Sequence, residues 1–215
     1  MVLRGFSPFW LPENSDIDPR LGSHTDLSIF VYERYIVAAA YLKENAELVK
    51  LLTNRGYIIS FSSASQGKAY PNDINLCATV IGKFLLHNTA YTDTLINEIQ
   101  NLIPIHVNQG YARCTALAVD KNSIITSDNG IAAAAKRNGL DVLLIEAGGI
   151  TLEGFDMGFI GGAAFKSGNK IYFTGDINSH PNVEAIVEFL KERNIEYDCL
   201  SEGELFDIGG AIVLN

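Results

Sequence analysis

Short hydrophobic stretches alternate with polar turns along this chain, in an order that recurs four times. Residues 114–119 and 123–126 are two such stretches joined by a polar turn, which is typical of a pair of short strands. Asp128 or Asn129 would then cap a helix that ends before an Asn-Gly pair, and residues 141–145 read as a buried strand. This segment therefore predicts a β-β-α-β unit.

The same order of elements appears on both sides of this unit. In the unit that follows, the helix carries four apolar residues spaced i, i+3, i+4 and i+7, which predicts one buried face. In the two units that precede it, a pair of short strands again leads to a helix and a third strand. The predicted repeats cover roughly residues 24–62, 73–109, 111–147 and 156–202.

Two observations favour blades around an axis over a doubly wound nucleotide-binding sheet. Two short strands, rather than one, precede each helix, and no G-x-G-x-x-G follows a first strand. Repeats of this length are typical of solenoids, propellers and arrays. The sequence therefore predicts an α/β propeller of β-β-α-β repeats.

The last ten residues, FDIGGAIVLN at 206–215, resemble the stretch FDMGFIGGA at 155–163. We expect them to open a fifth blade that the N-terminal segment around residues 3–10 completes, because closing the ring removes an unpaired strand edge. The prediction is a single domain over residues 1–215, a five-bladed propeller whose last blade is closed by both chain termini.

Composition narrows the class of protein without naming an activity. The chain has 215 residues, 47% of them hydrophobic, and a net charge of −9, which argues against a nucleic-acid partner. No apolar run approaches the roughly 20 residues of a membrane helix, and the N-terminus does not read as a signal peptide, so no membrane partner is expected. Three cysteines without metal-type spacing fit a reducing cytoplasm. Motifs for zinc, phosphate and haem are absent, so no metal or cofactor is expected, and the oligomeric state stays open.

Aspartates begin four of the five predicted blades. Equivalent positions of a propeller converge on its axis, so Asp26, Asp156 and Asp207, with Asn75 beside them, would form an acidic pocket. Carboxylates bind a planar guanidinium through paired hydrogen bonds, which makes it a suitable ligand. The alternative is that each aspartate only makes a turn before a strand. The stretches are DLS at 26–28, DIN at 73–75, DMG at 156–158 and DIG at 207–209.

The β-β-α-β repeats, the His24-Thr25-Asp26 stretch and the Gly-Gly openings resemble the pentein, or guanidino-group-modifying-enzyme, superfamily. Its members are five-bladed α/β propellers that include arginine and agmatine deiminases and amidinotransferases. The stretches QGYARC at 109–114 and GFDMGFIGGA at 154–163 are similar to an uncharacterised bacterial branch of the fold. The resemblance covers essentially the whole chain as a repeat pattern and implies a small cationic guanidino compound as ligand.

The resemblance also implies a histidine, an aspartate and a nucleophilic cysteine. His24 and Asp26 match the family's H-x-D motif, in which the histidine is the acid/base and the aspartate binds guanidinium. In the family, a thiolate attacks the guanidinium carbon, the histidine protonates the leaving amine, and water resolves the intermediate. The family's cysteine follows a C-terminal Gly-rich turn, but no cysteine follows Gly209 here. The nucleophile is then Cys114, or Cys77 if the ring is circularly permuted.

Arg113 precedes Cys114, and an arginine beside a thiol would lower its pKa. Each cysteine has the alternative reading of a small buried hydrophobic residue. Two functions therefore stay open. One is a cysteine-dependent hydrolase or transferase acting on a small guanidino compound, and the other is a catalytically silent propeller that binds a ligand or a protein partner.

Overall fold

The computed structural model describes residues 5–214 and contains four three-stranded sheets of one topology. In each sheet the second strand pairs antiparallel with the first and parallel with the third. An antiparallel pair closes through a tight turn, whereas the parallel pair needs a longer crossover, which here contains a helix. The four predicted β-β-α-β units are therefore present, in the predicted order.

The elements of the four units are short and regular. The first unit consists of β1 (Ile29–Tyr32), β2 (Tyr35–Ala38), α2 (Ala46–Asn54) and β3 (Ile58–Phe61). The second consists of β4 (Thr79–Ile81), β5 (Phe84–His87), α3 (Thr94–Asn97) and β6 (Ile103–His106). The third consists of β7 (Ala116–Ala118), β8 (Ser123–Thr126), α5 (Asn129–Arg137) and β9 (Asp141–Leu144). The fourth consists of β11 (Ala164–Ser167), β12 (Lys170–Phe173), α6 (Val183–Glu192) and β13 (Glu196–Cys199).

Further short elements join these units. Two helices, α1 (Thr25–Ser28) and α4 (Ala112–Thr115), come immediately before β1 and β7. A two-stranded parallel sheet pairs β10 (Ile150–Thr151) with β14 (Leu205–Phe206). The 3-10 helices are Pro19–Leu21, Ala40–Glu44 and Ile177–Ser179.

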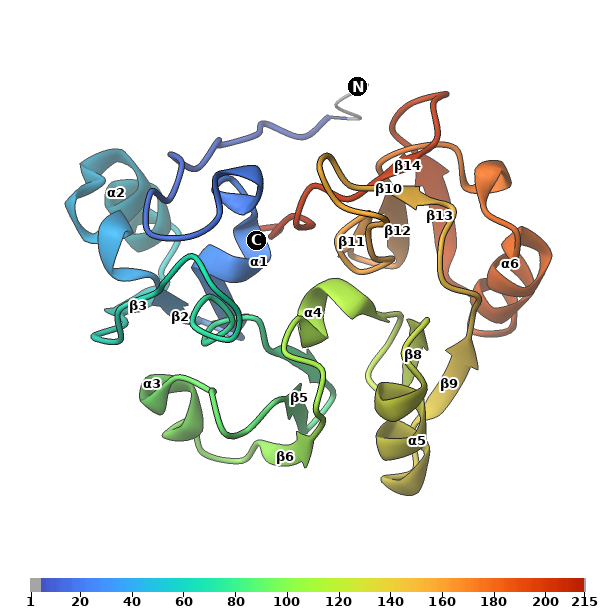
Figure 1. Cartoon of the computed structure of the whole chain (residues 1–215), viewed down its shortest axis with the longest axis horizontal. Coiled ribbons are helices and arrows are strands. Elements are labelled where there is room, and N and C mark those ends of the chain that lie inside the picture. The colour runs from blue at the N-terminus through green and yellow to red at the C-terminus, as the bar shows by residue number, and fades with distance from the viewer. Residues whose placement is uncertain (1–4, 215) are drawn as a thin grey trace.

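Figure 1 shows the four sheets arranged around a common centre, with α2, α3, α5 and α6 on the outside. The short helices α1 and α4 lie on the inner side of their sheets, next to this centre. The residues just before the first strands of the first and third units are therefore those that face the centre. This arrangement determines where a site can form.

Hydrophobic side chains pack mainly between neighbouring sheets. Phe173 of β12 packs with Ile125 of β8, and Ile124 of β8 packs on its other side with Leu86 of β5. Because strand residues alternate between the two faces of a sheet, one short strand supplies two clusters. A smaller cluster that contains Leu27, Cys77 and Cys114 occupies the centre, so both thiols lie in partly apolar surroundings.

The predicted fifth blade is not formed as a sheet. Phe206, the first residue of the predicted segment, lies in β14, but this strand pairs with β10 and not with the N-terminal segment. Residues 5–14 and 207–214 contain no strand, and residues 3, 4 and 215 of the predicted blade lie outside the described residues. Gly209 and Gly210 both have positive φ (73° and 63°), a conformation that does not continue a strand. Both chain ends nevertheless pack on the first sheet's cluster, through Phe9, Leu11, Ile212 and Leu214.

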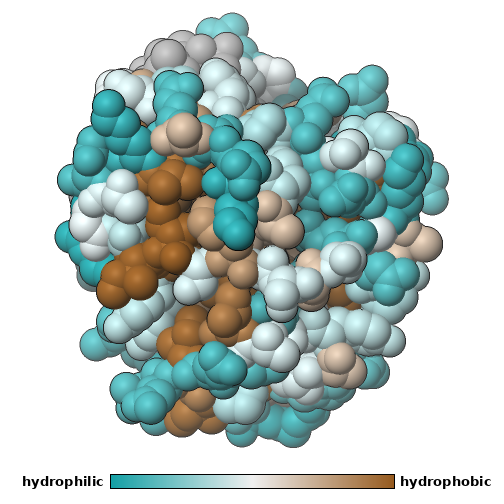
Figure 2. Space-filling model, turned by 90° about the vertical axis from the view of Figure 1, so that its left-hand side faces the viewer, coloured by the Kyte–Doolittle hydropathy of each residue, from teal (hydrophilic) through white to brown (hydrophobic). Residues whose placement is uncertain are grey.

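The first sheet also exposes hydrophobic side chains at its outer edge. Figure 2 shows them gathered on the side of the molecule that carries α2 and β3. Ile58 of the edge strand β3 is 55% exposed and Tyr35 of β2 is 48% exposed. In residues 5–214, no helix is both long enough and apolar enough to cross a membrane.

Candidate functional site

Five polar side chains converge at the centre of the molecule, and none of them is more than 7% exposed. Asp26 lies on α1 and Cys114 on α4, whereas Cys77 lies in the turn before β4 and Asp207 follows β14. His24 is the residue before α1. The structure thus brings together five of the residues selected from the sequence, and their roles stay predictions. We call His24, Asp26, Cys77, Cys114 and Asp207 the central cluster.

The Cys114 thiol connects the Asp26 carboxylate to the second thiol. Its Sγ donates a hydrogen bond to Asp26 Oδ2 at 2.5 Å and lies 3.5 Å from Cys77 Sγ. His24 Nδ1 lies 3.8 Å from Asp26 Oδ1, an oxygen that is buried and has no hydrogen-bond partner within residues 5–214. A buried carboxylate oxygen without a donor is unfavourable, so a cationic or hydrogen-bonding ligand would be stabilised here.

Asp207 is held in the central cluster by backbone donors. Phe159 N donates to its Oδ2 and Gly209 N to its Oδ1, both at 2.9 Å. Burial, and then the charge of Asp26, raises the pKa of Asp207 to about 6. The charge of Asp26 disfavours the ionised form of Asp207, and a bound cation would relieve that repulsion.

The prediction of an activated Cys114 thiol is wrong for this structure. Burial, the contact with Cys77 and the charges of Asp26 and Asp207 raise the pKa of Cys114 well above its ordinary value. Arg113 does not offset this, because its Nη1 donates to the carbonyl oxygen of Ile29 at 2.9 Å. Consecutive residues on a helix do not face the same way, so an arginine adjacent in sequence need not lie beside the thiol.

Asp156 and Asn75 do not join the central cluster. Asp156 is exposed and lines, together with Glu204, a separate surface cavity of about 280 Å³. Asn75 Nδ2 donates to Asp93 Oδ2 at 3.2 Å. The predicted acidic pocket is therefore reduced to the two carboxylates of the central cluster.

Buried Asp73 and half-buried Tyr111 form a hydrogen-bonded pair that the sequence did not assign to the site. Tyr111 Oη donates to Asp73 Oδ2 at 2.7 Å, and the other carboxylate oxygen is buried without a hydrogen-bond partner within residues 5–214. Burial raises the pKa of Asp73, and burial together with this carboxylate raises the pKa of Tyr111. The position of Tyr111 in the QGYARC stretch was the available signal in the sequence.

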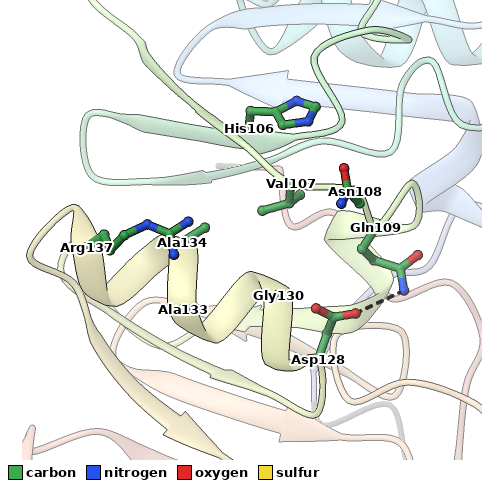
Figure 3. A pocket seen from close by; sticks show the side chains of 9 residues that line it. All are labelled: His106, Val107, Asn108, Gln109, Asp128, Gly130, Ala133, Ala134 and Arg137. Atoms are coloured by element: carbon green, nitrogen blue, oxygen red, sulfur yellow. Dashed lines mark hydrogen bonds between the residues drawn. The ribbon is translucent and has the colours of Figure 1, made fainter.

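A cavity of about 410 Å³ lies between the end of β6 and helix α5 (Figure 3). Gln109 turns toward Asp128, with 3.5 Å between Nε2 and Oδ2, while His106 and Arg137 lie farther along the cavity. No residue of the central cluster lines it. No sequence motif includes His106 or Arg137, which come from an outer strand and the end of a helix.

We expect Asp207 to make the free energy of unfolding depend on pH between about 4 and 6. A raised folded-state pKa gives a contribution that is fully present below the ordinary value of 3.8 and lost as the pH rises through about 6. The shift corresponds to about 2–3 kcal/mol. Urea unfolding from pH 4 to pH 7.5 should therefore show Asp207→Asn gaining stability relative to the wild type by about this amount.

The exposed Asp156→Asn variant is the control for this measurement and should show no such change. A difference between the wild type and Asp207→Asn that is independent of pH would contradict the raised pKa.

A model of a protein family matches residues 3–212, and its description is "Family of unknown function (DUF6873)". The chain belongs to the DUF6873 family. No curated protein matches it.

Solved structures similar to this DUF6873 chain include a DDAH in complex with citrulline and proteins named as amidinotransferases. A mutant of DDAH from Pseudomonas aeruginosa in complex with citrulline has a TM-score of 0.51 at 8% identity, over 86% of this chain and 71% of that one. The inosamine-phosphate amidinotransferase of Streptomyces griseus has a TM-score of 0.51 at 10% identity, over 86% of this chain and 64% of that one. An amidinotransferase from Microseira wollei has a TM-score of 0.43 at 12% identity, over 56% of this chain and 39% of that one. The likeness to the first two shows that the DUF6873 chain has the pentein fold.

The central cluster of this DUF6873 chain has a defined chemical capacity. Two carboxylates can bind a cation, an imidazole can exchange protons near neutral pH, and a thiol can form a covalent bond to carbon. These groups are in direct or near contact, and burial excludes bulk water from them.

Proposed function

We propose that this DUF6873 chain is a cysteine-dependent hydrolase or transferase that acts on a small guanidino compound. The observation that carries the proposal is the contact between Cys114 and Asp26 at the centre of a pentein fold. Beside His24, the other oxygen of Asp26 has no hydrogen-bond partner among the residues that the structure describes. A guanidinium is planar and has five N–H donors, so it matches such an oxygen in charge and in hydrogen bonding.

The proposed reaction begins when the guanidinium binds Asp26 and Asp207. Its positive charge opposes the two carboxylates that raise the pKa of Cys114, so substrate binding itself favours the thiolate. The thiol proton passes to Asp26 Oδ2, which it already contacts, and then to His24. The thiolate sulfur adds to the guanidinium carbon, and the tetrahedral adduct expels an amine that takes a proton from His24.

The resulting amidino group on sulfur is then transferred to an acceptor. Attack by water on its carbon releases a urea-type product and restores the thiol, which makes the protein a hydrolase. Attack by an acceptor amine gives a new guanidino compound, which makes it a transferase.

Entry of the substrate requires a segment of chain to move, because the central cluster is buried. The contacts of Gly209 with Asp26 and His24 would have to break for the substrate to enter. Its carbonyl oxygen accepts a hydrogen bond from Asp26 N at 3.2 Å, and a Cβ at its position would lie 2.6 Å from His24 Cβ. We therefore propose residues 208–214 as the entry gate.

We also propose that the whole chain is one domain, a five-bladed propeller in which both chain ends occupy the fifth position. Support comes from the four sheets around one centre and from the packing of both ends on the first sheet's cluster. We propose a cytoplasmic location as well, since the odd number of cysteines and their spacing fit a reducing compartment.

A second candidate function is a catalytically silent protein that binds a ligand or a protein partner. The raised pKa of Cys114 and its burial favour this alternative, because an unliganded nucleophile usually has a lowered pKa and some exposure. The two candidates differ in turnover, not in fold.

We expect guanidino cations to stabilise the protein. At a concentration of about 100 Kd, arginine, agmatine or guanidinium would add about 3 kcal/mol and raise Tm by roughly 5–10 °C. Citrulline, which lacks the charge, should raise it less. The Asp26→Asn variant should lose the difference between charged and neutral ligands, and the exposed Asp156→Asn variant should keep it.

The same ligands should be assayed for release of ammonia or a urea-type product, and for amidino transfer to added amines. Equal shifts with charged and neutral ligands, together with no product, would rule out a guanidino site. A cation-specific shift without product supports the silent binding protein.

A further inference from the structure

Three side chains of the central cluster could together bind a metal ion, a role that is separate from binding a guanidinium. Asp26, Cys77 and Cys114 each offer one ligating atom, and these atoms all lie within 4.8 Å of one another. All three residues are buried. Two adjacent thiols and a carboxylate are typical ligands of Zn²⁺, since thiolates select soft and borderline metals.

The spacing of the two sulfurs fits a tetrahedral ion. With Zn–S distances of about 2.3 Å, tetrahedral geometry separates two sulfurs by roughly 3.8 Å. Cys77 Sγ and Cys114 Sγ are 3.5 Å apart, so both can reach one ion with a shift of a few tenths of an ångström.

A second observation points to a ligand at the same place. Asp26 is 1% exposed, and its Oδ1 has no hydrogen-bond partner in the part of the chain that the structure describes. The other oxygen, Oδ2, already contacts the Cys114 thiol. An ion that replaces the thiol proton would satisfy the carboxylate and the sulfur together.

The three ligands come from three different units of the fold. Asp26 precedes β1, Cys77 precedes β4 and Cys114 precedes β7, and the first strand of each unit begins within three residues of its ligand. An ion held by all three would therefore tie the first, second and third sheets together at the centre.

We propose that Asp26, Cys77 and Cys114 form a Zn²⁺ site. Binding exchanges two thiol protons for the ion: two S–H bonds break, two Zn–S bonds form, and two protons leave to solvent. The site goes beyond the proposed guanidino activity and opposes it, because the ion would occupy the Asp26 and Cys114 atoms that a guanidino substrate needs. His24 is not among these mutually close ligand atoms, but its Nδ1, at 3.8 Å from Asp26 Oδ1, would orient the carboxylate from outside the ligand set.

The test uses the purified full chain without any guanidino compound. Co²⁺, a spectroscopic substitute for Zn²⁺, should bind one ion per chain and give a thiolate-to-metal charge-transfer band. The band should be lost in Cys77→Ser and in Cys114→Ser and should persist in Cys199→Ser, the matched control. Zn²⁺ added to the Co²⁺-loaded wild type should abolish the band, and Zn²⁺ added to the metal-free wild type should release about two protons per ion.

X-ray absorption on the zinc-loaded wild type provides a readout that needs no variant to fold. It should show two sulfur neighbours at about 2.3 Å and lighter ligands at about 2.0–2.2 Å. No sulfur neighbour in this spectrum, or a Co²⁺ band that survives in both serine variants, would overturn the zinc site. Metal binding is measured without substrate and turnover without metal, so failure of one proposal leaves the other standing.

Discussion

Replacement of Gly162 by alanine is expected to lower the free energy of unfolding by about 3 kcal/mol or more. A Cβ at this position would lie 1.9 Å from Asp207 Oδ1 and 2.4 Å from its Cγ. Asp207 cannot swing away freely, since Phe159 N and Gly209 N hold its two oxygens. The backbone cannot yield easily either, because Gly162 O accepts hydrogen bonds from both Ile208 N and Gly210 N.

Gly203→Ala is the matched control for this substitution. The nearest atom to a Cβ at Gly203 is Ser201 Oγ, at 4.0 Å, so the change should alter stability by less than about 0.5 kcal/mol. Urea unfolding followed by circular dichroism would measure both variants. If Gly162→Ala unfolds within that same margin of the wild type, Asp207 does not pack against Gly162 as the structure shows.

The four units were predictable from the sequence because hydrophobic periodicity reports local structure directly. The structure of the fifth unit could not be predicted in this way, although residues 206–215 carry a strand-like pattern. Two consecutive glycines at positive φ bend this segment inward, so that Ile208 N and Gly210 N both bond to Gly162 O instead of to a neighbouring strand. A pattern of side chains cannot reveal this, since the choice depends on what the glycines contact across the fold.

Some residues of the central cluster could be predicted because they lie at equivalent positions, just before the first strand of a unit. Asp26, Cys77 and Cys114 each lie two or three residues before a first strand, and such positions face the centre. Asp156 looks equivalent in sequence but lies eight residues before β11, and the intervening loop leaves it exposed. Asp207 occupies the central position next to the fourth unit instead, through its hydrogen bond from Phe159 N.

The ionisation of the thiol could not be read from sequence neighbours. Arg113 adjoins Cys114 in the chain, but it bonds to a backbone carbonyl, while Cys114 faces two carboxylates from distant segments. Burial is the largest cause of the raised pKa of Cys114, and burial is a property of the assembled fold. A cysteine next to an arginine is therefore not sufficient evidence for an activated thiol.

Replacing Cys114 by serine is expected to abolish turnover of a guanidino substrate, with kcat lower by about 1000-fold or more. Cys77→Ser should retain turnover within about tenfold of the wild type, because only Cys114 contacts Asp26, the proposed acceptor of the thiol proton. Cys199→Ser is the control and should behave as the wild type. Initial rates on metal-free protein, with unfolding curves for each variant, would measure this.

Alkylation of the wild type separates the possible outcomes of this experiment. Because the pKa of Cys114 is raised, iodoacetamide at neutral pH should label it more slowly than Cys199, and a bound guanidino cation that favours the thiolate should change that rate.

If Cys77→Ser is inactive and Cys114→Ser is active, Cys77 is the nucleophile and the permuted arrangement holds. If the wild type turns over no guanidino compound and both central thiols stay unreactive with ligand, the chain is a binding protein, because a thiol that never ionises cannot attack carbon.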